Sequence, residues 1–386
     1  MDIKLFTDIL KDKHMNDYQK MKYKYKADFF EFLKVLEQFY YTNLPITDFD
    51  GIPIVFVENQ VEIKQEVTKL MLQSRDKHYG IQAAENEIVA TSAIESIDFS
   101  RDSVRNILKG LAPKDEQENR ILGIKKGLEF IADTENKINE ENLYKLYCMT
   151  VGDFLEKEEQ LNKGQFYRHD SVYVVSHRVE HAGLDHQKIP AYMEKLMAFI
   201  DAKDDINDFV KAAIIHFYIA YVHPYFDGNG RMARFLHLWF LVQKGYRSAL
   251  FIPFSSQIEK NRKAYYAAFT AIEENKKYSG KIDVTPFVLF CVQCVYHKLQ
   301  QETVSVNVLQ EYDNAVRKGL VTKKEIALWQ FVLSCYGIGE FSTKQLEKDF
   351  GEAAYATIRN FVLKFERLGL FSSTKYGARV RYKVVH

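Results

Sequence analysis

The chain has 386 residues, of which 47% are hydrophobic, 14% aromatic and 27% charged, a balance that predicts a folded protein with little disorder. Its 53 Lys or Arg and 52 Asp or Glu residues leave a net charge of +1, which excludes a global bias toward nucleic acid or anionic membranes. The length predicts two or three domains. Four cysteines do not suggest a disulfide scaffold, and no signal peptide or membrane-spanning run is recognisable, so we expect a cytoplasmic protein without membrane contact.

Residues 1–112 are predicted to form a mainly helical N-terminal region with one short strand at 52–57. Its hydrophobic faces could serve the region's own core or a homodimer. From about residue 82 to 108 the pattern is helical, with a break near residue 99, and Glu95 lies on that helix. Taken alone, a glutamate in such a place is an ordinary solvated surface residue.

Residues 113–301 are predicted to form a mostly helical core, in which residues 171–175 are rich in β-branched and aromatic side chains and predict a strand. Two groups of residues could suggest zinc sites, namely His177, His181 and His186, and Cys291, Cys294 and His297. Neither group has the spacing or the second ligand pair of a zinc motif. We therefore expect exposed loop histidines and buried structural cysteines.

The most informative stretch of the core is a predicted helix–loop–helix. Residues 212–222 have the length and apolar density of a buried helix, and a second helix is predicted from about residue 230 to 241. Pro224 disfavours helical geometry at His223, so the first helix should end there and present the imidazole. An imidazole in such a position can take a proton near neutral pH.

The loop between these two helices concentrates groups suited to phosphate chemistry. Gly228 and Gly230 allow consecutive N–H groups to converge at the N-terminus of the second helix, an arrangement that binds phosphate. Arg231 and Arg234 lie three residues apart and can reach the same anion. Asp227 supplies the hard oxygen ligand that a phosphate-bound Mg²⁺ prefers. A solvated loop is the alternative, and the joint arrangement argues against it.

Residues 302–386 are predicted to be a linker and a winged helix, because three helices are followed by a hairpin. The boundaries behind this prediction are capping-box patterns at 322–325 and 342–345, glycine stops at Gly351 and Gly369, and strands at 370–374 and 378–384. From residue 341 onward there are nine Lys or Arg against four Asp or Glu. This surplus suggests DNA contact, and protein docking or dimerisation is the alternative. The candidate DNA contacts are Arg359, Lys364, Arg379 and Arg381.

The stretch from His223 to Arg234 resembles the Fic-family signature, H-P-F-x-D/E-G-N-G-R-x-x-R, with tyrosine in place of the usual phenylalanine. Fic proteins are mostly nucleotidyltransferases that move AMP from ATP to a protein hydroxyl and release pyrophosphate. The resemblance implies that His223 deprotonates the target hydroxyl and that Asp227 holds Mg²⁺. It also implies a set of phosphate ligands, with Gly228, Asn229 and Gly230 around the α-phosphate and Arg231 and Arg234 at the β- and γ-phosphates.

Residues 91–96 resemble the inhibitory-helix pattern of many Fic proteins, S/T-x-x-x-E-G/N, with Ser96 in place of the final glycine or asparagine. The placement before the core resembles the subclass whose inhibitory helix is N-terminal in the same chain. The resemblance implies that Glu95 pairs with Arg234 and keeps the γ-phosphate out. Replacing Glu95 by glycine should then activate the enzyme.

Two further segments resemble parts of Fic proteins. Residues 164–168 resemble the G-x-Y-R segment that opens the family's flap, which implies that an extended protein target docks by strand addition near Val172–Val175. Residues 261–266 resemble the N/Q-R-x-x-Y-Y segment near the adenine pocket, which implies that Tyr266 borders the base. Several relatives carry an asparagine where this chain has Glu273, so the identity of the nucleotide donor stays open.

The sequence therefore predicts a mainly α protein with a Fic-type helical core, a small β-hairpin flap and a C-terminal winged helix. The implied function is a protein adenylyltransferase that uses ATP and Mg²⁺ to modify a Ser, Thr or Tyr hydroxyl and is self-inhibited by Glu95. Three alternatives remain: transfer of another phosphate-containing moiety, removal of AMP with Glu95 positioning a water, and a nucleotide-sensing DNA-binding regulator. Retention of His223 argues against the regulator, because binding alone does not need a base.

Overall fold

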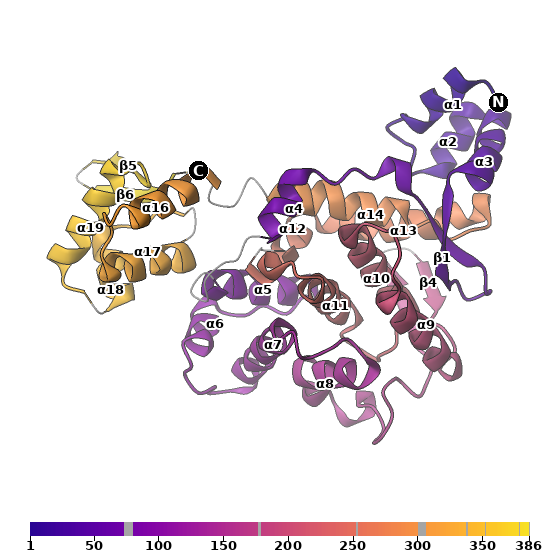
Figure 1. Cartoon of the computed structure of the whole chain (residues 1–386). Coiled ribbons are helices and arrows are strands. Elements are labelled where there is room, and N and C mark those ends of the chain that lie inside the picture. Colours follow the sequence, from indigo (N-terminus) through magenta and orange to yellow (C-terminus); the bar gives the residue numbers. More distant parts are fainter. Residues whose placement is uncertain are drawn as a thin grey trace.

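The computed structural model describes residues 1–72, 80–176, 179–251, 254–299, 306–336, 339–351, 353–377 and 379–385. Within these residues the protein is mainly helical and carries three antiparallel strand pairs, so the predicted fold class is confirmed. Figure 1 shows an N-terminal group of helices, a central helical body, and a C-terminal lobe in orange and yellow beyond the body. No helix in these ranges combines the length and the apolar character needed to cross a bilayer.

The N-terminal helices form a small core of their own, which buries aromatic side chains such as Phe29 and Phe32. These helices are α1 (Ile3–Leu10), α2 (Tyr18–Tyr25) and α3 (Ala27–Phe39). They lead into a strand pair made of β1 (Tyr41–Thr47) and β2 (Pro53–Val57). The strand expected at 52–57 is therefore confirmed, whereas β1 was missed. Pro45 within β1 accounts for this, because proline cannot donate to a strand ladder, and the pairing register shifts between Asn43 and Thr47.

The central body is built from helices that share one continuous hydrophobic core, which includes buried residues from Leu44 to Tyr296. Its helices are α4 (Gln65–Leu72), α5 (Gly80–Ile94), α6 (Arg101–Leu108), α7 (Glu116–Ala132), α8 (Glu140–Thr150), α9 (Ile189–Asp201), α10 (Asp208–Val222), α11 (Asn229–Gln243), α12 (Phe254–Lys260), α13 (Arg262–Ser279), α14 (Thr285–Phe290) and α15 (His297–Leu299). Shorter turns are η1 (Glu58–Gln60), η3 (Gly152–Phe154), η4 (Lys157–Glu159), η5 (His186–Lys188), η6 (Arg247–Phe251) and the π-turn η7 (Cys291–Tyr296).

Three of these helices position the functional site. α10 is buried along almost its whole length and packs against α11, which follows it in the chain. α5 packs against both α11 and α12, so a helix from the first hundred residues lies beside the motif helix (Figure 1). The two helices expected around residues 212–222 and 230–241 are thus confirmed as α10 and α11.

The flap is a short hairpin of β3 (Tyr173–Ser176) and β4 (Val179–Ala182), paired antiparallel from Tyr173 opposite Ala182 to Ser176 opposite Val179. The strand expected at 171–175 therefore begins two residues later. Of the histidines near this hairpin, His177 lies outside the described residues. The cysteines of the second candidate zinc group lie in the π-turn η7, where Cys291 is buried.

The C-terminal lobe has its own hydrophobic core, formed around Trp329, Phe361, Phe365 and Phe371. Its elements are α16 (Val306–Arg317), α17 (Lys323–Cys335), α18 (Thr343–Phe350), α19 (Tyr355–Arg367), β5 (Phe371–Tyr376) and β6 (Arg379–Val384). The expected order of three helices and a hairpin is present, while the assignment as a winged helix stays a prediction. The lobe meets the body where α17 packs against α5.

The helix caps that the sequence predicted in this lobe are only partly confirmed. Thr322 forms the complete capping box that the sequence predicted. Ser342 forms only half of one, because its hydroxyl accepts from the N–H of Gln345 while the side-chain oxygen of Gln345 accepts from Arg381. Residue 378, the expected start of the last strand, lies outside the described residues.

Candidate functional site

The candidate catalytic histidine stands at the end of a buried helix. α10 ends at Val222, and His223 follows with φ 55° and ψ 61°, in the left-handed region that histidine visits more readily than bulky or branched residues. The N–H of His223 still donates to the carbonyl oxygen of Ile219 at 3.1 Å, so this residue caps the helix as the chain turns away. Pro224 follows, and the helix ends where the sequence predicted.

The motif loop (residues 223–228) joins α10 to α11 and is closed by the side chain of Asn229. Its Oδ1 accepts from the N–H of Tyr225 at 2.9 Å, and its Nδ2 donates to the carbonyl oxygen of Tyr225 at 2.8 Å. The ring of Tyr225 is buried and stacks on Tyr147, with centroids 3.9 Å apart and 7° between the planes. The amide of Asn229 therefore shapes the loop, and the phosphate role predicted for this residue would fall to its main-chain N–H.

Arg168 fastens the motif loop to the base of the flap. Its buried guanidinium donates from Nε to the carbonyl oxygen of His223 at 2.9 Å and from Nη1 to that of Asp170 at 2.6 Å. Nη2 donates to the carbonyl oxygen of Leu184, and the main-chain N–H of Arg168 donates to that of Pro224 at 2.9 Å. One side chain thus ties together the loop that carries the histidine and both ends of the flap.

The two motif arginines are buried, with exposed fractions of 6% for Arg231 and 1% for Arg234. Nη1 of Arg231 donates to the carbonyl oxygen of Thr150 at 2.9 Å, while its Nε has no hydrogen-bond partner among the described residues. Nη1 of Arg234 is also buried and unpaired within the described ranges. A Cβ built on Gly230 would lie 3.3 Å from this Nη1, so glycine leaves the space beside it open. Unpaired buried N–H groups are costly, and a phosphate would satisfy them.

Glu95 reaches into the same space from the end of α5. Its Oε1 lies 2.6 Å from Nη2 of Arg234 and would lie 2.7 Å from a Cβ on Gly230. The pairing of Glu95 with Arg234 that the resemblance implied is therefore found. Burial alone would raise the pKa of Glu95, but neighbouring arginines outweigh it and hold that pKa below its usual value. In decreasing order of effect these are Arg234, Arg231 and Arg262.

The first position of the inhibitory pattern also contacts Arg234. Nε of Arg234 donates to Oγ1 of Thr91 at 2.8 Å, and Nη2 donates to the carbonyl oxygen of Thr91 at 3.1 Å. Thr91 and Glu95 are one helical turn apart, so both meet the same guanidinium. The spacing of the pattern therefore has a direct geometric reason.

The last position of the pattern adopts a backbone conformation that favours glycine or asparagine. Ser96 has φ 61°, in the left-handed region, and a serine there costs roughly 1 kcal/mol relative to glycine. The hydroxyl of Ser96 accepts a hydrogen bond from Nη2 of Arg262 at 3.3 Å. The departure from the family pattern thus introduces both strain and a new contact.

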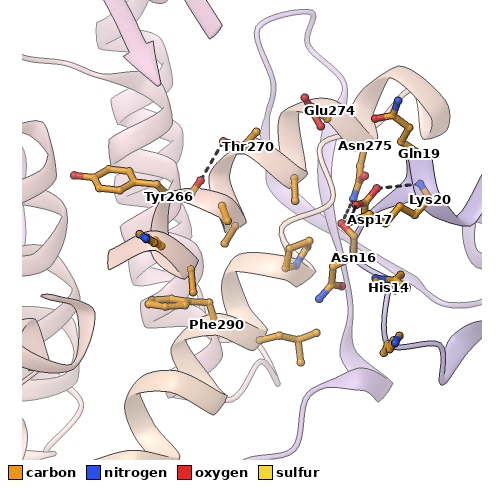
Figure 2. Close-up of a pocket in the computed structure, with 18 of the residues that line it drawn as sticks. His14, Asn16, Asp17, Gln19, Lys20, Tyr266, Thr270, Glu274, Asn275 and Phe290 are labelled. Atoms are coloured by element: carbon orange, nitrogen blue, oxygen red, sulfur yellow. Dashed lines mark hydrogen bonds and ion pairs between the residues drawn. The ribbon is translucent and has the colours of Figure 1, made fainter. Parts of the chain in front are cut away.

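Tyr266, the residue expected to border the base, lines a cavity of about 700 Å³ between α2 and the helices α13 and α14 (Figure 2). In Figure 2 its ring extends away from the α2 residues, and the guanidinium carbon of Arg262 lies 5.9 Å from the ring centroid. Polar lining residues of this cavity include His14, Asn16, Asp17, Lys20, Glu274 and Asn275. No residue of the motif lines this cavity, so the cavity is separate from the candidate phosphate site. The role of Tyr266 stays a prediction.

A layer of buried titratable groups lies close to Arg234. Burial lowers the pKa of His237 to about 3 and that of His216 well below its usual value. Nε2 of His216 shares a hydrogen bond of 3.0 Å with the hydroxyl of Tyr265. Burial raises the pKa of Glu87, whose charge also acts on Arg234. Nothing in the sequence pattern singled out these groups, because they sit inside apolar helices.

Asp227, the candidate metal ligand, is exposed at the end of the motif loop, next to the glycines. In the described part of the chain, no three His, Cys, Asp or Glu side chains lie close enough together to hold a metal ion by themselves. Mg²⁺ is commonly held by one or two carboxylates plus substrate phosphates. A single carboxylate beside a phosphate cradle therefore fits a Mg²⁺ ion that binds together with a nucleotide.

Sequence reasoning missed two residues of the site. Arg168 was not expected to hold the main chain of His223, and Arg262 was not expected to reach the end of α5. Both arginines belong to segments whose resemblance to Fic proteins was noted, G-x-Y-R and N/Q-R-x-x-Y-Y. The arginine that each of these two family patterns contains was therefore the sequence signal that could have identified Arg168 and Arg262 as residues of the site.

Comparison with known proteins agrees with this geometry. Residues 137–241, which include the motif loop and most of α11, match the Fic/DOC family. Over 286 residues the chain is 22% identical to the protein adenylyltransferase Fic of Drosophila ananassae, a match that covers 67% of this chain and 52% of the relative. The Drosophila mojavensis protein of the same name is 25% identical over 187 residues, covering 46% and 32%. The chain thus spans about half the length of the first of these curated relatives and about a third of the length of the second.

Solved structures extend the likeness to most of the fold. A Fic family protein from Desulfovibrio desulfuricans G20 aligns with 84% of this chain and 97% of its own, at 17% identity and a TM-score of 0.52. A Fic domain containing signaling protein from Bacteroides thetaiotaomicron aligns with 61% and 93%, at 16% identity and a TM-score of 0.50. Such identities show the fold alone. Together with the family match, they show that residues 137–241 carry a Fic/DOC-family region within a fold like that of solved Fic proteins.

Proposed function

We propose that this chain is a protein adenylyltransferase, which transfers AMP from ATP to a Ser, Thr or Tyr hydroxyl of a protein. The observation that carries the proposal is a pair of buried N–H groups without a hydrogen-bond partner among the described residues, Nε of Arg231 and Nη1 of Arg234, the second of them beside Gly230. Two cations held by the fold next to a glycine suit the β- and γ-phosphates of a nucleotide. The family match over residues 137–241 and the names of the Drosophila relatives support the same reaction.

The proposed mechanism needs one base and several charge-neutralising groups. His223 takes the proton of the target hydroxyl as its oxygen attacks the α-phosphorus. The bond from that phosphorus to the bridging oxygen of the β-phosphate breaks, and pyrophosphate leaves. Arg231 and Arg234 neutralise the charge that develops on the leaving group, and the N–H groups after Gly228 hold the α-phosphate. Mg²⁺ held by Asp227 would neutralise further phosphate charge when bound.

The proposed target site is the flap, near Val172–Val175. β3 and β4 form a two-stranded sheet without a further strand among the described residues, so an extended segment could pair with its edge. Arg168 links this hairpin to the carbonyl oxygen of His223, which supports a hydroxyl presented close to the base.

Glu95 is the proposed internal inhibitor. Its carboxylate pairs with Arg234 at 2.6 Å and lies against Gly230, where a γ-phosphate would need both the cation and the space. Two negative groups cannot share this site without strong repulsion. The wild-type protein should therefore have low activity until Glu95 withdraws.

The test compares the wild type, Glu95→Gly, and the double variant Glu95→Gly/His223→Ala. Each is incubated with α-labelled ATP and, separately, with γ-labelled ATP in the presence of Mg²⁺, and label on protein is measured. We expect label from the α-position alone, strongest in Glu95→Gly and absent from the double variant. Label from the γ-position alone would show phosphoryl transfer instead. Nucleotide binding without any transfer would favour the sensor function.

A groove on the C-terminal lobe favours a second candidate function, binding of duplex DNA. The groove has a volume of about 620 Å³ and lies between the start of α18, the exposed face of α19 and β6. Its basic lining residues are Lys344, Arg359, Arg379 and Arg381, and none of the described residues that line it is an Asp or Glu. A basic groove beside a helix and a hairpin suits the phosphates of a duplex.

One predicted DNA contact is wrong. The ammonium group of Lys364 lies 2.8 Å and 2.9 Å from the two carboxylate oxygens of Glu325 and does not line the groove. Arg359 and Lys364 lie five positions apart on α19 and so point to different faces of that helix, which the charge count alone could not separate. Lys364 therefore connects α19 to the start of α17, where Glu325 also closes the capping box.

The DNA proposal is tested by the anisotropy of a fluorescent duplex at several salt concentrations. Arg359→Ala and Arg379→Ala should weaken binding, and each lost phosphate contact should reduce the salt dependence by about 0.9 in log–log slope. Lys348→Ala is the matched control, because Lys348 is exposed on α18 but lies outside the groove. Equal affinity of all variants, or no binding at low salt, would contradict the proposal and favour a protein-docking role.

A further inference from the structure

The C-terminal turn of α5 carries an electrostatic conflict. α5 ends at Ile94, and the last carbonyl oxygens of a helix carry partial negative charge. Glu95 adds a full negative charge directly after this end. A carboxylate is unfavourable at such a position unless cations offset it. Arg234 provides one of these cations, since its Nη2 lies 2.6 Å from Oε1 of Glu95.

Arg262 brings a second cation to the same turn. It is the first residue of α13, and its Nη1 donates to the carbonyl oxygen of Ala93 at 3.3 Å. Its Nη2 donates to Oγ of Ser96, also at 3.3 Å. The guanidinium stacks toward the ring of Tyr266, four residues further along the same helix, which limits its freedom. Arg262 therefore caps the end of a helix to which it does not belong.

The two arginines differ in what they hold. Arg234 contacts the carboxylate of Glu95, and in the proposed reaction a γ-phosphate competes for that same guanidinium. Arg262 contacts the main chain of Ala93, which lies in α5, and the hydroxyl of Ser96, two residues after the end of that helix. When a nucleotide takes Arg234, the contacts of Arg262 still oppose the withdrawal of the turn.

We propose that Arg262 is a latch that holds the last turn of α5 through Ala93 and Ser96, and so sets how firmly Glu95 blocks the phosphate site. This inference rests on the proposed function, because a latch on Glu95 regulates only a reaction that Glu95 blocks. Arg262 is a positioning residue that acts through Glu95. The serine supplies a hydroxyl for the latch that a glycine at this position could not supply.

Hydrogen exchange tests the latch without any assumption about the reaction. In the last turn of α5, the N–H of Ser96 donates to Ala93 at 3.0 Å and that of Ile97 donates to Ser92 at 2.9 Å. Arg262→Ala should speed exchange of these amides roughly tenfold, because it removes two charge-assisted bonds. Ser96→Ala should have a smaller effect in the same direction.

The control for this measurement is Lys263→Ala, which removes a neighbouring exposed charge. It should leave the exchange of the α5 amides unchanged. If exchange is the same in Arg262→Ala as in the wild type, the latch is overturned, whichever reaction the protein catalyses.

Labelling from α-labelled ATP tests whether the latch acts through Glu95. Arg262→Ala should raise labelling roughly tenfold in the wild-type background and should not raise it further in the Glu95→Gly background, where there is no carboxylate left to release. An equal loss in both backgrounds would overturn the proposal, because Arg262 would then act as a nucleotide ligand. Faster exchange without labelling of any variant would support the latch and contradict the adenylyltransferase.

Discussion

The guanidinium of Arg168 holds the carbonyl oxygen of His223 at 2.9 Å, so the main chain of the candidate base is fixed from outside its own helix. The same side chain reaches two further carbonyl oxygens, those of Asp170 and Leu184. His223 also has a left-handed backbone, a conformation that persists only where surrounding contacts hold it. The position of the imidazole therefore depends on a residue 55 positions earlier in the chain.

Replacing Arg168 should affect catalysis more than nucleotide binding. In the Glu95→Gly background, we expect Arg168→Gln to lower the rate of AMP transfer by ~10–100-fold, because a misplaced base loses most of its effect. The affinity for ATP, measured by calorimetry, should change less than about threefold, since Arg168 contacts none of the phosphate residues.

The control for this prediction is Lys163→Gln, which changes an exposed residue just before the same segment. It should leave both rate and affinity unchanged. A loss of ATP affinity as large as the loss of rate in Arg168→Gln would show that this arginine supports the whole site and not the base alone.

Removing the carboxylate of Asp227 should appear as a change in the dependence on Mg²⁺. Asp227→Asn in the Glu95→Gly background should raise the Mg²⁺ concentration for half-maximal labelling by roughly tenfold or more, because a neutral amide is a weaker ligand for a hard cation. The measurement is a Mg²⁺ titration of the labelling rate at saturating ATP. An unchanged midpoint would assign the metal to other residues. Because Asp227 is exposed, the variant should fold normally.

A methyl group on Gly230 should block the space beside Arg234 in which the proposed triphosphate would bind. Its Cβ would lie 3.3 Å from Nη1 of Arg234, in the space that a phosphate oxygen needs. In the Glu95→Gly background, Gly230→Ala should weaken ATP binding by ~10-fold or more, measured by calorimetry. The backbone of Gly230 is helical, so the substitution should not lower the melting temperature. Normal ATP affinity in this variant would place the triphosphate elsewhere.

The buried histidines predict a loss of stability in mild acid. The pKa of His237 is about 3 and that of His216 is well below its usual value, both because of burial, whereas an unfolded histidine titrates near pH 6.5. The unfolded chain therefore binds more protons below about pH 6.5, and the free energy of unfolding is full above that pH and falls below it. Each histidine contributes a slope of up to about 1.4 kcal/mol per pH unit.

Urea denaturation between about pH 8 and pH 5 checks this slope. His237→Asn removes one of these titrating groups and should reduce the slope by up to about 1.4 kcal/mol per pH unit. The slope, and not the absolute stability, is the informative quantity, because the substitution also removes one of the two hydrogen-bond partners that the structure shows for the hydroxyl of Tyr296. An unchanged slope would mean that His237 is protonated in the folded protein.

Much of the site could be predicted from local patterns, and what could not be predicted depends on contacts between distant segments. The end of α10 followed from Pro224, and the start of α11 from the glycines of the loop. The contact between Arg234 and Glu95 joins residues 139 positions apart and came only from a family pattern. Without that pattern, Glu95 would have been read as a solvated surface residue.

Other failures have similar physical causes. β1 was missed because Pro45 interrupts its strand pattern, although Asn43 before it and Thr47 after it still pair with β2. Lys364 was misassigned because composition gives the charge of a segment but not the face on which each side chain lies. The fastening role of Arg168 was missed because its partners are carbonyl oxygens, which leave no trace in a sequence pattern.

The closure of the motif loop by Asn229 has a consequence for how such a protein can be controlled. Two hydrogen bonds to Tyr225, together with the stacking on Tyr147, hold the loop in one shape before any ligand binds. A nucleotide would then spend little of its binding energy on ordering the loop, because the loop is already preorganised for binding. Control by melting and refolding the motif loop is thereby disfavoured. Control by access remains, and it would act at the end of α5, where Glu95 occupies the space beside Gly230.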